Sequence, residues 1–506
     1  MNLEKELPLG WARSKIGEVC ESSQYGYTAK AGASGRVHFL RTTDITSGFL
    51  NWDTVPFCNI PEAEEKKYLI QDGDVVISRA GSVGFSYLIS NPRPAVFASY
   101  LIRFRPLITP KFFSYFLNTQ DYWNTIGERS LGIAVQNVNA SQLSEIELPI
   151  APLAEQTRIV EKLEELLSDL DAGVAELKAA QKKLGQYRQS LLKAAVEGAL
   201  TADWRTTNQA KETGTQLLER ILIERRARWE AKQLAKFKEQ DKAPPKDWQA
   251  KYPEPVKPDT SDLPELPDGW VWTSLDQLTE FITSGSRGWA NFYSHEGSTF
   301  IRSQNINKDY LDLSDIAFVT PPRNSEGERT RVGMNDLLLT ITGANVGKAA
   351  RVEIQVDEAY VSQHVALIRP VDLSLSNYLH LFLTASAGGR GQLDKEAYGA
   401  GKPGLNLQQV KLVLVPLPPN VEGNVLIECL ENQFNAITGQ SMQIALTLKQ
   451  SAAQRKNILK AAFSGQLVPQ DSNDEPAIVL LERIQAERSV QAASKMPLGR
   501  KRKQLA

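Results

Sequence analysis

Apolar residues recur every seven positions along two long, proline-free stretches of the chain, residues 155–197 and 422–464. Such a repeat lays one apolar seam along a helix, and that seam must be buried against another helix. A helix of about 44 residues is roughly 66 Å long at 1.5 Å per residue. The seam positions are Leu163, Leu170, Leu177, Leu184 and Leu191 in the first stretch, and Leu430, Ile437, Ile444, Ser451 and Ile458 in the second.

The charges of these stretches indicate how the two helices pair. Residues 155–176 carry seven acidic and two basic side chains, whereas residues 177–198 carry one acidic and five basic ones. Residues 422–443 carry three acidic and no basic side chains, and residues 444–465 carry four basic and no acidic ones. Antiparallel pairing brings opposite charges together, so we predict an antiparallel coiled coil. The alternative is that each helix packs only on its own domain.

The chain also contains an internal repeat. Its opening motif, Leu7-Pro-Leu-Gly-Trp11, returns as Leu266-Pro-Asp-Gly-Trp270, roughly 260 residues later. Further matches follow in the same order: Phe39–Arg41 with Phe300–Arg302, Asp74 with Asp336, Arg105–Pro106 with Arg369–Pro370, Lys193–Ala195 with Lys460–Ala462, and Leu217–Ile221 with Leu480–Ile484. A duplicated fold with small loop insertions explains the slow drift in their spacing, whereas chance does not.

Each copy divides into a β-rich part and a long helix. Short apolar runs alternate with Gly, Asn and Ser turns, which is typical of an α+β domain with an irregular, mainly antiparallel sheet. The fold class is therefore α+β, with two similar domains separated by two long helices. We expect domains at 1–150 and 266–417, long helices within 151–200 and 418–468, a helical and proline-rich linker at 201–265, and a helical segment with a basic tail at 469–506.

Composition excludes several classes of protein. Hydrophobic residues make up 42% and charged residues 23%, which favours a globular chain over a disordered one. The net charge is -1, so any surface that binds a polyanion must be local. Three cysteines and four histidines argue against a disulfide framework and a metal site. No apolar run approaches the roughly 20 residues that span a bilayer, and the first residues lack signal-peptide features, so we expect a soluble cytoplasmic protein.

No catalytic motif is complete. Gly343–Ala349 comes nearest to a phosphate-binding loop, but it is one residue short and lacks the hydroxyl that meets magnesium. Asn91–Pro94 departs from the stretch that holds an amino group for methyl transfer, because an arginine interrupts it and no aromatic residue follows. The histidines form no H-E-x-x-H pair. We therefore expect no catalytic residues and a chain that is not an enzyme.

The predicted helix pair has a symmetry with functional meaning. An antiparallel pair of equal helices has a two-fold axis through its middle, and duplex DNA has the same kind of axis. If each helix begins where its own domain ends, the two domains lie at opposite ends of the pair. Because the domains differ in sequence, such a molecule suits two unlike DNA half-sites at a fixed separation.

These motifs together resemble a known family. Over nearly its whole length, the chain resembles the specificity subunit of type I restriction–modification systems. The resemblance rests on the Leu-Pro-x-Gly-Trp motif that opens each half, on Pro149–Gln156, on the Lys-Ala-Ala helix ends at Lys193 and Lys460, and on Gly198–Arg205. The second copy departs at the start of its helix, where Pro419–Gly423 replaces the Leu-Ala-Glu-Gln of the first.

The resemblance implies two target recognition domains that read a bipartite, asymmetric DNA sequence. It also implies two methyltransferase subunits, which methylate adenine N6 with S-adenosylmethionine, and two motor–nuclease subunits that use ATP and Mg. The specificity chain itself would bind no cofactor. Positions on the helices that would dock the methyltransferase are Glu155, Gln156, Tyr187 and Arg188.

Polar loops in matching positions of both domains are the candidate DNA contacts. Arg and Lys suit phosphates and guanine, Asn and Gln suit adenine, and Thr or aromatic residues suit the thymine methyl group. In the first domain the candidates are Gln24, Tyr25, Tyr27, Arg41, Thr42, Thr43, Arg79, Ser82 and Gln136. In the second they are Arg287, Trp289, Arg302, Gln304, Asn305, Thr342, Asn345, Lys348 and Lys402.

Each of these predictions has a simpler structural alternative. Any single candidate fits an ordinary surface loop, and Arg41 and Arg302 equally suit a salt bridge within the fold. The basic halves of the long helices suit contacts with spacer phosphates, but we favour a solvated face that pairs with acidic residues of the facing helix. The alternative function is a coiled-coil scaffold whose end domains bind proteins instead of DNA.

Overall fold

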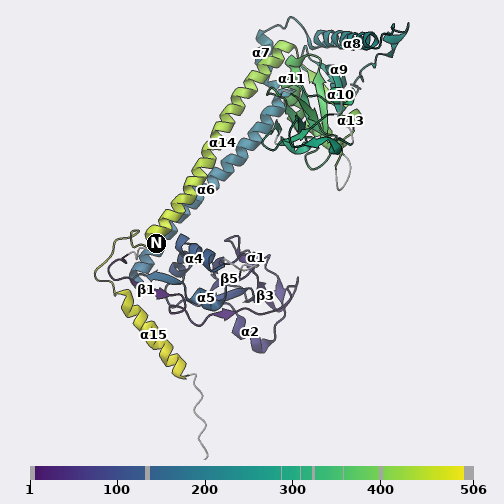
Figure 1. The fold of residues 1–506 in the computed structure, drawn as a ribbon. Coiled ribbons are helices and arrows are strands. Elements are labelled where there is room, and N and C mark those ends of the chain that lie inside the picture. The colour runs from purple at the N-terminus through teal and green to yellow at the C-terminus, as the bar shows by residue number, and fades with distance from the viewer. Residues whose placement is uncertain are drawn as a thin grey trace, which may run out of the picture. The chain divides into compact units, whose positions relative to one another are not determined.

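The computed structural model describes residues 6–130, 137–285, 288–307, 309–321, 325–356, 358–397 and 403–494 (Figure 1). The chain forms two compact units, which we call the first unit (Met1–Lys178 with Ile444–Ala506) and the second unit (Ala179–Gln443). Each unit therefore combines one β-rich domain with segments of both long helices. Within the described ranges, no helix is long and apolar enough to cross a membrane.

Short sheets organise the β-rich domain of the first unit. An antiparallel sheet has the order β2-β8-β5-β6, a second sheet has the order β4-β3-β7 with β3 and β7 parallel, and β1 pairs with β9. The strands are β1 (Ala12–Lys15), β2 (Gln24–Tyr25), β3 (Val37–Leu40), β4 (Phe57–Cys58), β5 (Val75–Ser78), β6 (Ser86–Leu88), β7 (Ala95–Phe97), β8 (Leu101–Phe104) and β9 (Glu147–Ile150). The helices are α1 (Thr42–Ile45), α2 (Glu62–Tyr68), α3 (Pro110–Phe116), α4 (Gln120–Ser130) and α5 (Ala140–Ser144). Every residue of β5 and β8, including Ser78 and Arg103, is buried, because both strands lie at the centre of their sheet.

The second unit repeats this topology. Its sheets have the orders β11-β20-β17-β18 and β12-β16-β13-β19, with β13 and β19 parallel, and β10 pairs with β21. The strands are β10 (Val271–Ser274), β11 (Thr279–Ser284), β12 (Tyr293–Ser294), β13 (Ser298–Ile301), β14 (Ile306–Asn307), β15 (Tyr310–Leu311), β16 (Ala317–Val319), β17 (Leu337–Thr340), β18 (Ala349–Arg351), β19 (Ala359–Val361), β20 (Val365–Pro370) and β21 (Leu414–Leu417). The helices are α9 (Leu275–Leu278), α10 (Ser325–Arg329), α11 (Ser376–Thr384), α12 (Gly389–Glu396) and α13 (Leu407–Lys411). The predicted duplicated α+β fold is confirmed.

Each unit contains the same buried ion pair. In the first unit Asp74, which is 1% exposed, accepts a hydrogen bond from Nε of Arg105 at 2.7 Å. In the second unit Asp336 accepts from Nε and Nη2 of Arg369 at 2.8 and 2.6 Å. Each carboxylate also accepts a backbone N–H from the turn before its strand. The repeated aspartates and the repeated Arg-Pro segments are therefore the two partners of one interaction.

The two long helices, α6 (Leu153–Val196) and α14 (Asn420–Ala462), lie side by side and run antiparallel in each unit (Figure 1). Their direction follows from which residues share a core: Leu163 and Leu459 belong to the core of the first unit, and Leu191 and Leu430 belong to the core of the second. Asp171 on the acidic half of α6 pairs with Arg455 on the basic half of α14. The seam is buried towards both ends, at Leu163, Leu191, Leu430 and Ile437, and half-buried between them. Opposite charges also meet, so the predicted antiparallel coiled coil is confirmed.

A shorter helix follows each long helix at an equivalent position. The two helices are α8 (Gly214–Glu239) and α15 (Ala477–Ser494), and they carry the repeated Leu-Leu-Glu-Arg-Ile segment. The first N–H of α8 donates to the carbonyl of Gly269 at 2.7 Å, and the first N–H of α15 donates to that of Gly10 at 2.8 Å. Both acceptors belong to the Leu-Pro-x-Gly-Trp motif, which therefore fixes where the following helix begins.

We expect Asp336→Asn to lower the free energy of unfolding of the second unit by about 2–3 kcal/mol, because the partly buried Arg369 guanidinium loses its charged partner. Asp74→Asn should have the same effect on the first unit. Asp53→Asn is the matched control, since Asp53 is 76% exposed in its ion pair with Arg93 and such a pair contributes about 1 kcal/mol or less. Chemical denaturation followed by tryptophan fluorescence measures the differences. Equal stability of Asp336→Asn and the control would contradict the expectation.

Candidate nucleic-acid interface

In the first unit, several predicted DNA contacts gather at one end of the sheets. Tyr25 ends β2, Arg41 follows β3 and Arg79 follows β5. The Arg79 guanidinium lies over the Tyr25 ring, 5.0 Å from its centroid, and the Tyr25 hydroxyl accepts the first N–H of α5 at 2.9 Å. Tyr27 joins them by donating its backbone N–H to the carbonyl of Phe97 at 2.7 Å. The topology thus brings loops that are far apart in the sequence to one edge.

Two of these candidates already have partners within the fold. Arg41 pairs with Asp44 at an Nη2–Oδ1 distance of 2.7 Å, and hydrogen bonding to this carboxylate raises the pKa of Arg41. Gln24 accepts a hydrogen bond from Arg103 and donates to the carbonyl of Lys67 at 3.1 Å. The salt-bridge alternative therefore holds for Arg41, although its side chain remains 40% exposed. Gln24 acts as a connection between strands.

Other candidates at this edge retain unused hydrogen-bonding capacity. The Thr42 hydroxyl and Nε of Arg79 are buried, and neither has a hydrogen-bond partner among the described residues. A buried polar atom without a partner costs roughly 1–3 kcal/mol. Thr43 and Ser82 are exposed on the adjacent loops. These four side chains remain candidates for contact with DNA.

In the second unit, Asp315 organises the corresponding loop. Its carboxylate accepts from Arg302 at 3.1 Å and from Gln304 at 2.7 Å. Its carbonyl accepts from Arg302 at 3.0 Å and from Asn305 at 2.9 Å. The Asn345 amide approaches the same loop and donates to one of its carbonyls at 3.3 Å. The loops that follow β13 and β17 therefore meet, as their counterparts do in the first unit.

Two residues of the second unit that we predicted to contact DNA, Trp289 and Asn305, are buried, so the prediction is wrong for both. Trp289 is 3% exposed and stacks on Phe300 with ring centroids 5.5 Å apart and an interplanar angle of 4°, and Tyr360 closes the same core. Asn305 is 2% exposed, and its amide holds the loop through two backbone carbonyls. Neither side chain has free surface for a base. Thr342 and Lys348 are half-buried in the loop of Asn345, whereas Gln136, Arg287 and Lys402 lie outside the described residues.

Two turns in these clusters were not among the predicted contacts. One joins β7 to β8 and has Ser99–Tyr100 at its centre, and the equivalent turn between β19 and β20 has Gln363–His364. Tyr100 is 61% exposed, and its carbonyl accepts the backbone N–H of Arg79 at 2.9 Å. The ungapped correspondence of residues 95–106 with 359–370 is the sequence feature that would have revealed them.

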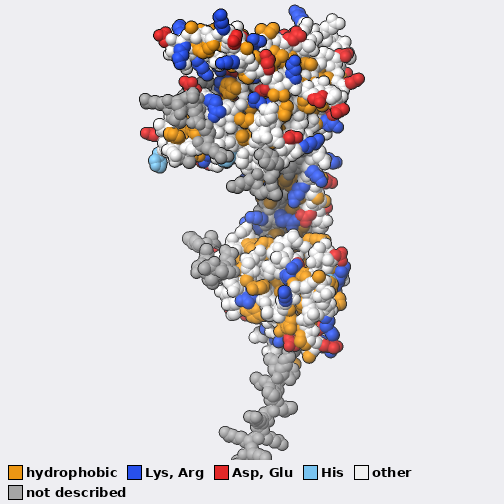
Figure 2. Space-filling model, turned by 90° about the vertical axis from the view of Figure 1, so that its right-hand side faces the viewer, with side chains coloured by type: hydrophobic (Ala, Val, Ile, Leu, Met, Phe, Trp, Pro, Cys, Tyr) orange, Lys and Arg blue, Asp and Glu red, His pale blue; other side chains and the backbone are white. Residues whose placement is uncertain are grey.

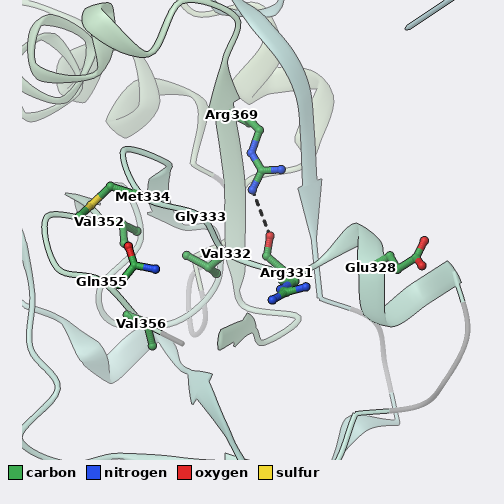
Figure 3. Close-up of a pocket in the computed structure, with 9 residues that line it drawn as sticks. All are labelled: Glu328, Arg331, Val332, Gly333, Met334, Val352, Gln355, Val356 and Arg369. Atoms are coloured by element: carbon green, nitrogen blue, oxygen red, sulfur yellow. Dashed lines mark hydrogen bonds between the residues drawn. The ribbon is translucent and has the colours of Figure 1, made fainter. Parts of the chain in front are cut away.

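A cavity of about 340 Å³ opens elsewhere in the second unit. Figure 3 shows its polar lining by Arg331, Arg369 and Glu328, and none of the predicted DNA contacts lines it. Arg369 donates to the carbonyl of Arg331 at 3.2 Å while it also pairs with Asp336. The guanidinium that dominates this cavity is therefore committed to the buried ion pair of the fold.

At the start of α6, both predicted docking residues are buried, and that prediction is corrected. Glu155 is 1% exposed and accepts a hydrogen bond from the indole nitrogen of Trp11 at 3.0 Å. Gln156 is fully buried, accepts from the backbone N–H of Thr109 at 3.1 Å and donates to the carbonyl of Ala151 at 2.9 Å. Burial raises the pKa of Glu155. These side chains attach the helix to its domain, so they present no outward docking surface.

The start of α14 has an equivalent glutamate with different partners. Glu422 is fully buried and accepts from Oγ1 of Thr201 and from Nη1 of Arg205, both at 2.6 Å. Arg205 also donates to the carbonyl of Gly198 at 2.7 Å, at the end of α6. The indole nitrogen of Trp270 has no hydrogen-bond partner among the described residues. The second copy therefore keeps the acid but replaces the indole donor by a guanidinium.

The other two docking candidates lie further along α6. Tyr187 is 47% exposed, and the Arg188 guanidinium lies over the Phe434 ring of α14, 3.9 Å from its centroid. On the face drawn in Figure 2, basic side chains are dispersed among acidic ones over both units and the long helices. This dispersion fits the net charge of -1. Tyr187 and Arg188 are both exposed, so both remain docking candidates.

The family model and the relatives that match this chain are described as the same kind of protein. Residues 8–179 match the family model described as the type I restriction modification DNA specificity domain. The chain is 24% identical over 475 residues to the EcoBI specificity subunit of Escherichia coli, covering 91% of this chain and 88% of the relative. It is 23% identical over 516 residues to the EcoKI specificity subunit of Escherichia coli strain K12, covering 97% of this chain and 98% of the relative.

Solved structures share the fold. A chain of a type I restriction–modification system, solved to explain its assembly and conformational transition, superposes with a TM-score of 0.64 at 17% identity, covering 91% of this chain and 99% of that one. The HsdS subunit of Thermoanaerobacter tengcongensis gives a TM-score of 0.50 at 17% identity and coverages of 92% and 99%. The fold defines a class of duplicated α+β proteins built on an antiparallel helix pair. Within that class, residues 8–179 are similar to the type I restriction modification DNA specificity domain, and the chain over most of its length is similar to the specificity subunits of type I restriction enzymes.

The two buried glutamates should respond differently to neutralisation. Because burial raises the pKa of Glu155 above its ordinary value of 4.5, its stabilising contribution is complete below that pH and is lost as the pH rises through the raised pKa. Glu155→Gln, which keeps an oxygen for Trp11, should remove this loss and leave the free energy of unfolding at pH 7 unchanged or higher. Glu422→Gln should lower it by about 2–3 kcal/mol, because Arg205 loses its charged partner. Denaturation curves at pH 5 and pH 7 measure both effects, and an equal loss in the two variants would contradict them.

Proposed function

We propose that the chain reads a bipartite, asymmetric DNA sequence, with each unit contacting one half-site through the major groove. The observation that carries the proposal is the equivalence of the two edges. The same strand ends and turns recur in both units, but they present different side chains. One fold with two sets of polar side chains suits two different base sequences. The relatives are described as specificity subunits of type I restriction enzymes, and the proposal extends that role to this chain.

The chemistry of the edge supports this proposal. Arg79 and Arg41 place guanidinium groups beside exposed hydroxyl and aromatic side chains, and arginine is the most common reader of guanine as well as a phosphate ligand. The overall charge is close to neutral, so the electrostatic attraction to DNA would be local to these edges.

As part of the same proposal, the chain assembles with two methyltransferase subunits and two motor–nuclease subunits. The methyltransferases would dock on the long helices, where Tyr187 is exposed, and methylate adenine N6 with S-adenosylmethionine. ATP and Mg would belong to the motor subunits. The chain itself would be non-catalytic, bind no cofactor and work in the cytoplasm. A scaffold whose domains bind proteins is the competing function, and it implies no sequence-dependent retention on DNA at moderate salt.

Genomic DNA from cells that contain this chain and its partner methyltransferase should carry adenine methylation in one motif made of two unlike half-sites. Arg79→Ala should relax one position of one half-site, since a guanidinium–guanine contact gives about 1–3 kcal/mol of discrimination. Arg93→Ala is the matched control, because Arg93 is a surface arginine of the same unit with an exposed ion pair. Methylation sequencing makes the measurement. Contiguous motifs, or none, would count against the proposal.

If the long helices set the separation of the half-sites, shortening both should shorten the spacer. Removal of one heptad from each, residues 177–183 and 441–447, keeps the apolar seam in phase and shortens the pair by about 10 Å. At 3.4 Å per base pair this corresponds to roughly three base pairs. The same methylation map should then show unchanged half-sites around a shorter spacer. An unchanged spacer would refute the measuring role of the helices.

A further inference from the structure

The turns at residues 98–101 and 362–365 are held by the same three backbone hydrogen bonds. In the first unit these are Ala98 N to Leu40 O at 2.9 Å, Leu101 N to Ala98 O at 2.8 Å and Arg79 N to Tyr100 O at 2.9 Å. In the second unit they are Ser362 N to Ile301 O at 2.9 Å, Val365 N to Ser362 O at 3.0 Å and Ile341 N to His364 O at 2.9 Å. One hydrogen bond closes each turn, and the other two connect it to the ends of two other strands. The backbone of the turn is therefore held in place.

A glycine lies in close contact with the backbone of each turn. A Cβ atom at Gly26 would overlap the carbonyl oxygens of Phe97 and Ala98, and a Cβ atom at Gly285 would overlap that of Val361. Only glycine allows the chain after β2 and β11 to approach so closely. The backbone around both turns is therefore packed in the same way on every side.

Against this equivalent frame, the two central residues of the turns differ in chemistry. The first turn presents Ser99 and Tyr100, a hydroxyl and a phenol, and the large Tyr100 side chain is 61% exposed. The second presents Gln363 and His364, an amide and an imidazole whose nitrogens lie 3.2 Å apart. A tyrosine combines an apolar ring with a hydroxyl group, and such side chains are enriched at surfaces that bind partners.

The turns also lie next to the predicted arginine positions. Leu40, whose carbonyl accepts the hydrogen bond from Ala98, directly precedes Arg41. Arg79 donates its own backbone N–H to the carbonyl of Tyr100. In the second unit the corresponding neighbours are Arg302 and Thr342, each one residue from a hydrogen-bonded position. A turn in this place is flanked by groups suited to phosphates, while its own side chains are free to face base edges.

We propose that these two turns determine the base sequence of the two half-sites, an inference that rests on the proposed function. Ser99–Tyr100 would read the first half-site by aromatic contact, which suits the methyl group of thymine, together with a hydroxyl hydrogen bond. Gln363–His364 would read the second by hydrogen bonding, and a glutamine amide matches the N6 and N7 edge of adenine. Arg41 and Arg302, beside the turns, would contact phosphates and position the duplex.

The test exchanges the turns within the full chain, in cells that also contain the partner methyltransferase. The double variant S99Q/Y100H gives the first unit the second turn, and Q363S/H364Y makes the reciprocal change. Each should alter one position or more of its own half-site and leave the other half-site unchanged, with at least a tenfold fall in methylation of the original motif. Phe49→Ala and His295→Ala are the controls, because both residues are exposed on other loops of the same units.

The outcomes separate the inference from the proposed function. A bipartite motif in the wild type that stays unchanged in both exchange variants would overturn the inference and leave the proposed function standing. A wild type without any bipartite motif would remove the proposed function itself. If an exchange variant abolishes methylation, Tyr100→Phe and Gln363→Glu, which nearly keep side-chain size, decide the matter: loss of preference at one position by Gln363→Glu supports the inference, and an unchanged motif in both contradicts it.

Discussion

The structure depends on the contact between each Leu-Pro-x-Gly-Trp motif and two helix ends. In the first unit Trp11 hydrogen-bonds to Glu155 at the start of α6. The close approaches that complete the contact are Gly10 with Pro152 and Pro8 with Gly465 in the first unit, and Gly269 with Pro419 and Pro267 with Gly198 in the second. Each motif therefore touches the start of its own helix and the end of the other. Because both helix ends are fixed to the same short motif, the register of the antiparallel pair is set at the domains as well as along the seam.

This arrangement divides the chain into a constant frame and variable positions. The buried Asp–Arg pairs and the three turn hydrogen bonds recur at equivalent positions in both units. Interiors are closely packed, so changes in the frame cost stability, whereas exposed side chains on a rigid turn can change at little cost. A duplicated fold can therefore hold two different sets of surface side chains in equivalent places. Such a division suits a protein whose two halves share one architecture and differ in what they contact.

Sequence patterns revealed the frame better than the site. The heptad seam, the helix ends and the duplication follow from periodicity and repetition, which are properties of the chain itself. Polar residues such as Glu155 and Gln156 were expected on the surface because their types are usually exposed, but their burial depends on Trp11 and Thr109, more than forty residues away. Trp289 matched the chemistry of a base contact, yet stacking on Phe300 and Tyr360 removes it from the surface. Burial of this kind is decided by tertiary contacts that no local pattern contains.

The charges at the two helix starts also disfavour the pairing of a second copy with itself. In the first unit Arg158 near the start of α6 binds Asp474, which follows α14, at 2.6 Å. In the second unit the acidic and basic positions are exchanged: Glu422 lies near the start of α14 and binds Arg205, which follows α6. A second copy paired with itself would bring Asp474 towards Glu422 without an arginine, since Val425 stands at the position that corresponds to Arg158. Two like charges near a buried site are unfavourable, so these ion pairs disfavour the pairing of two second copies.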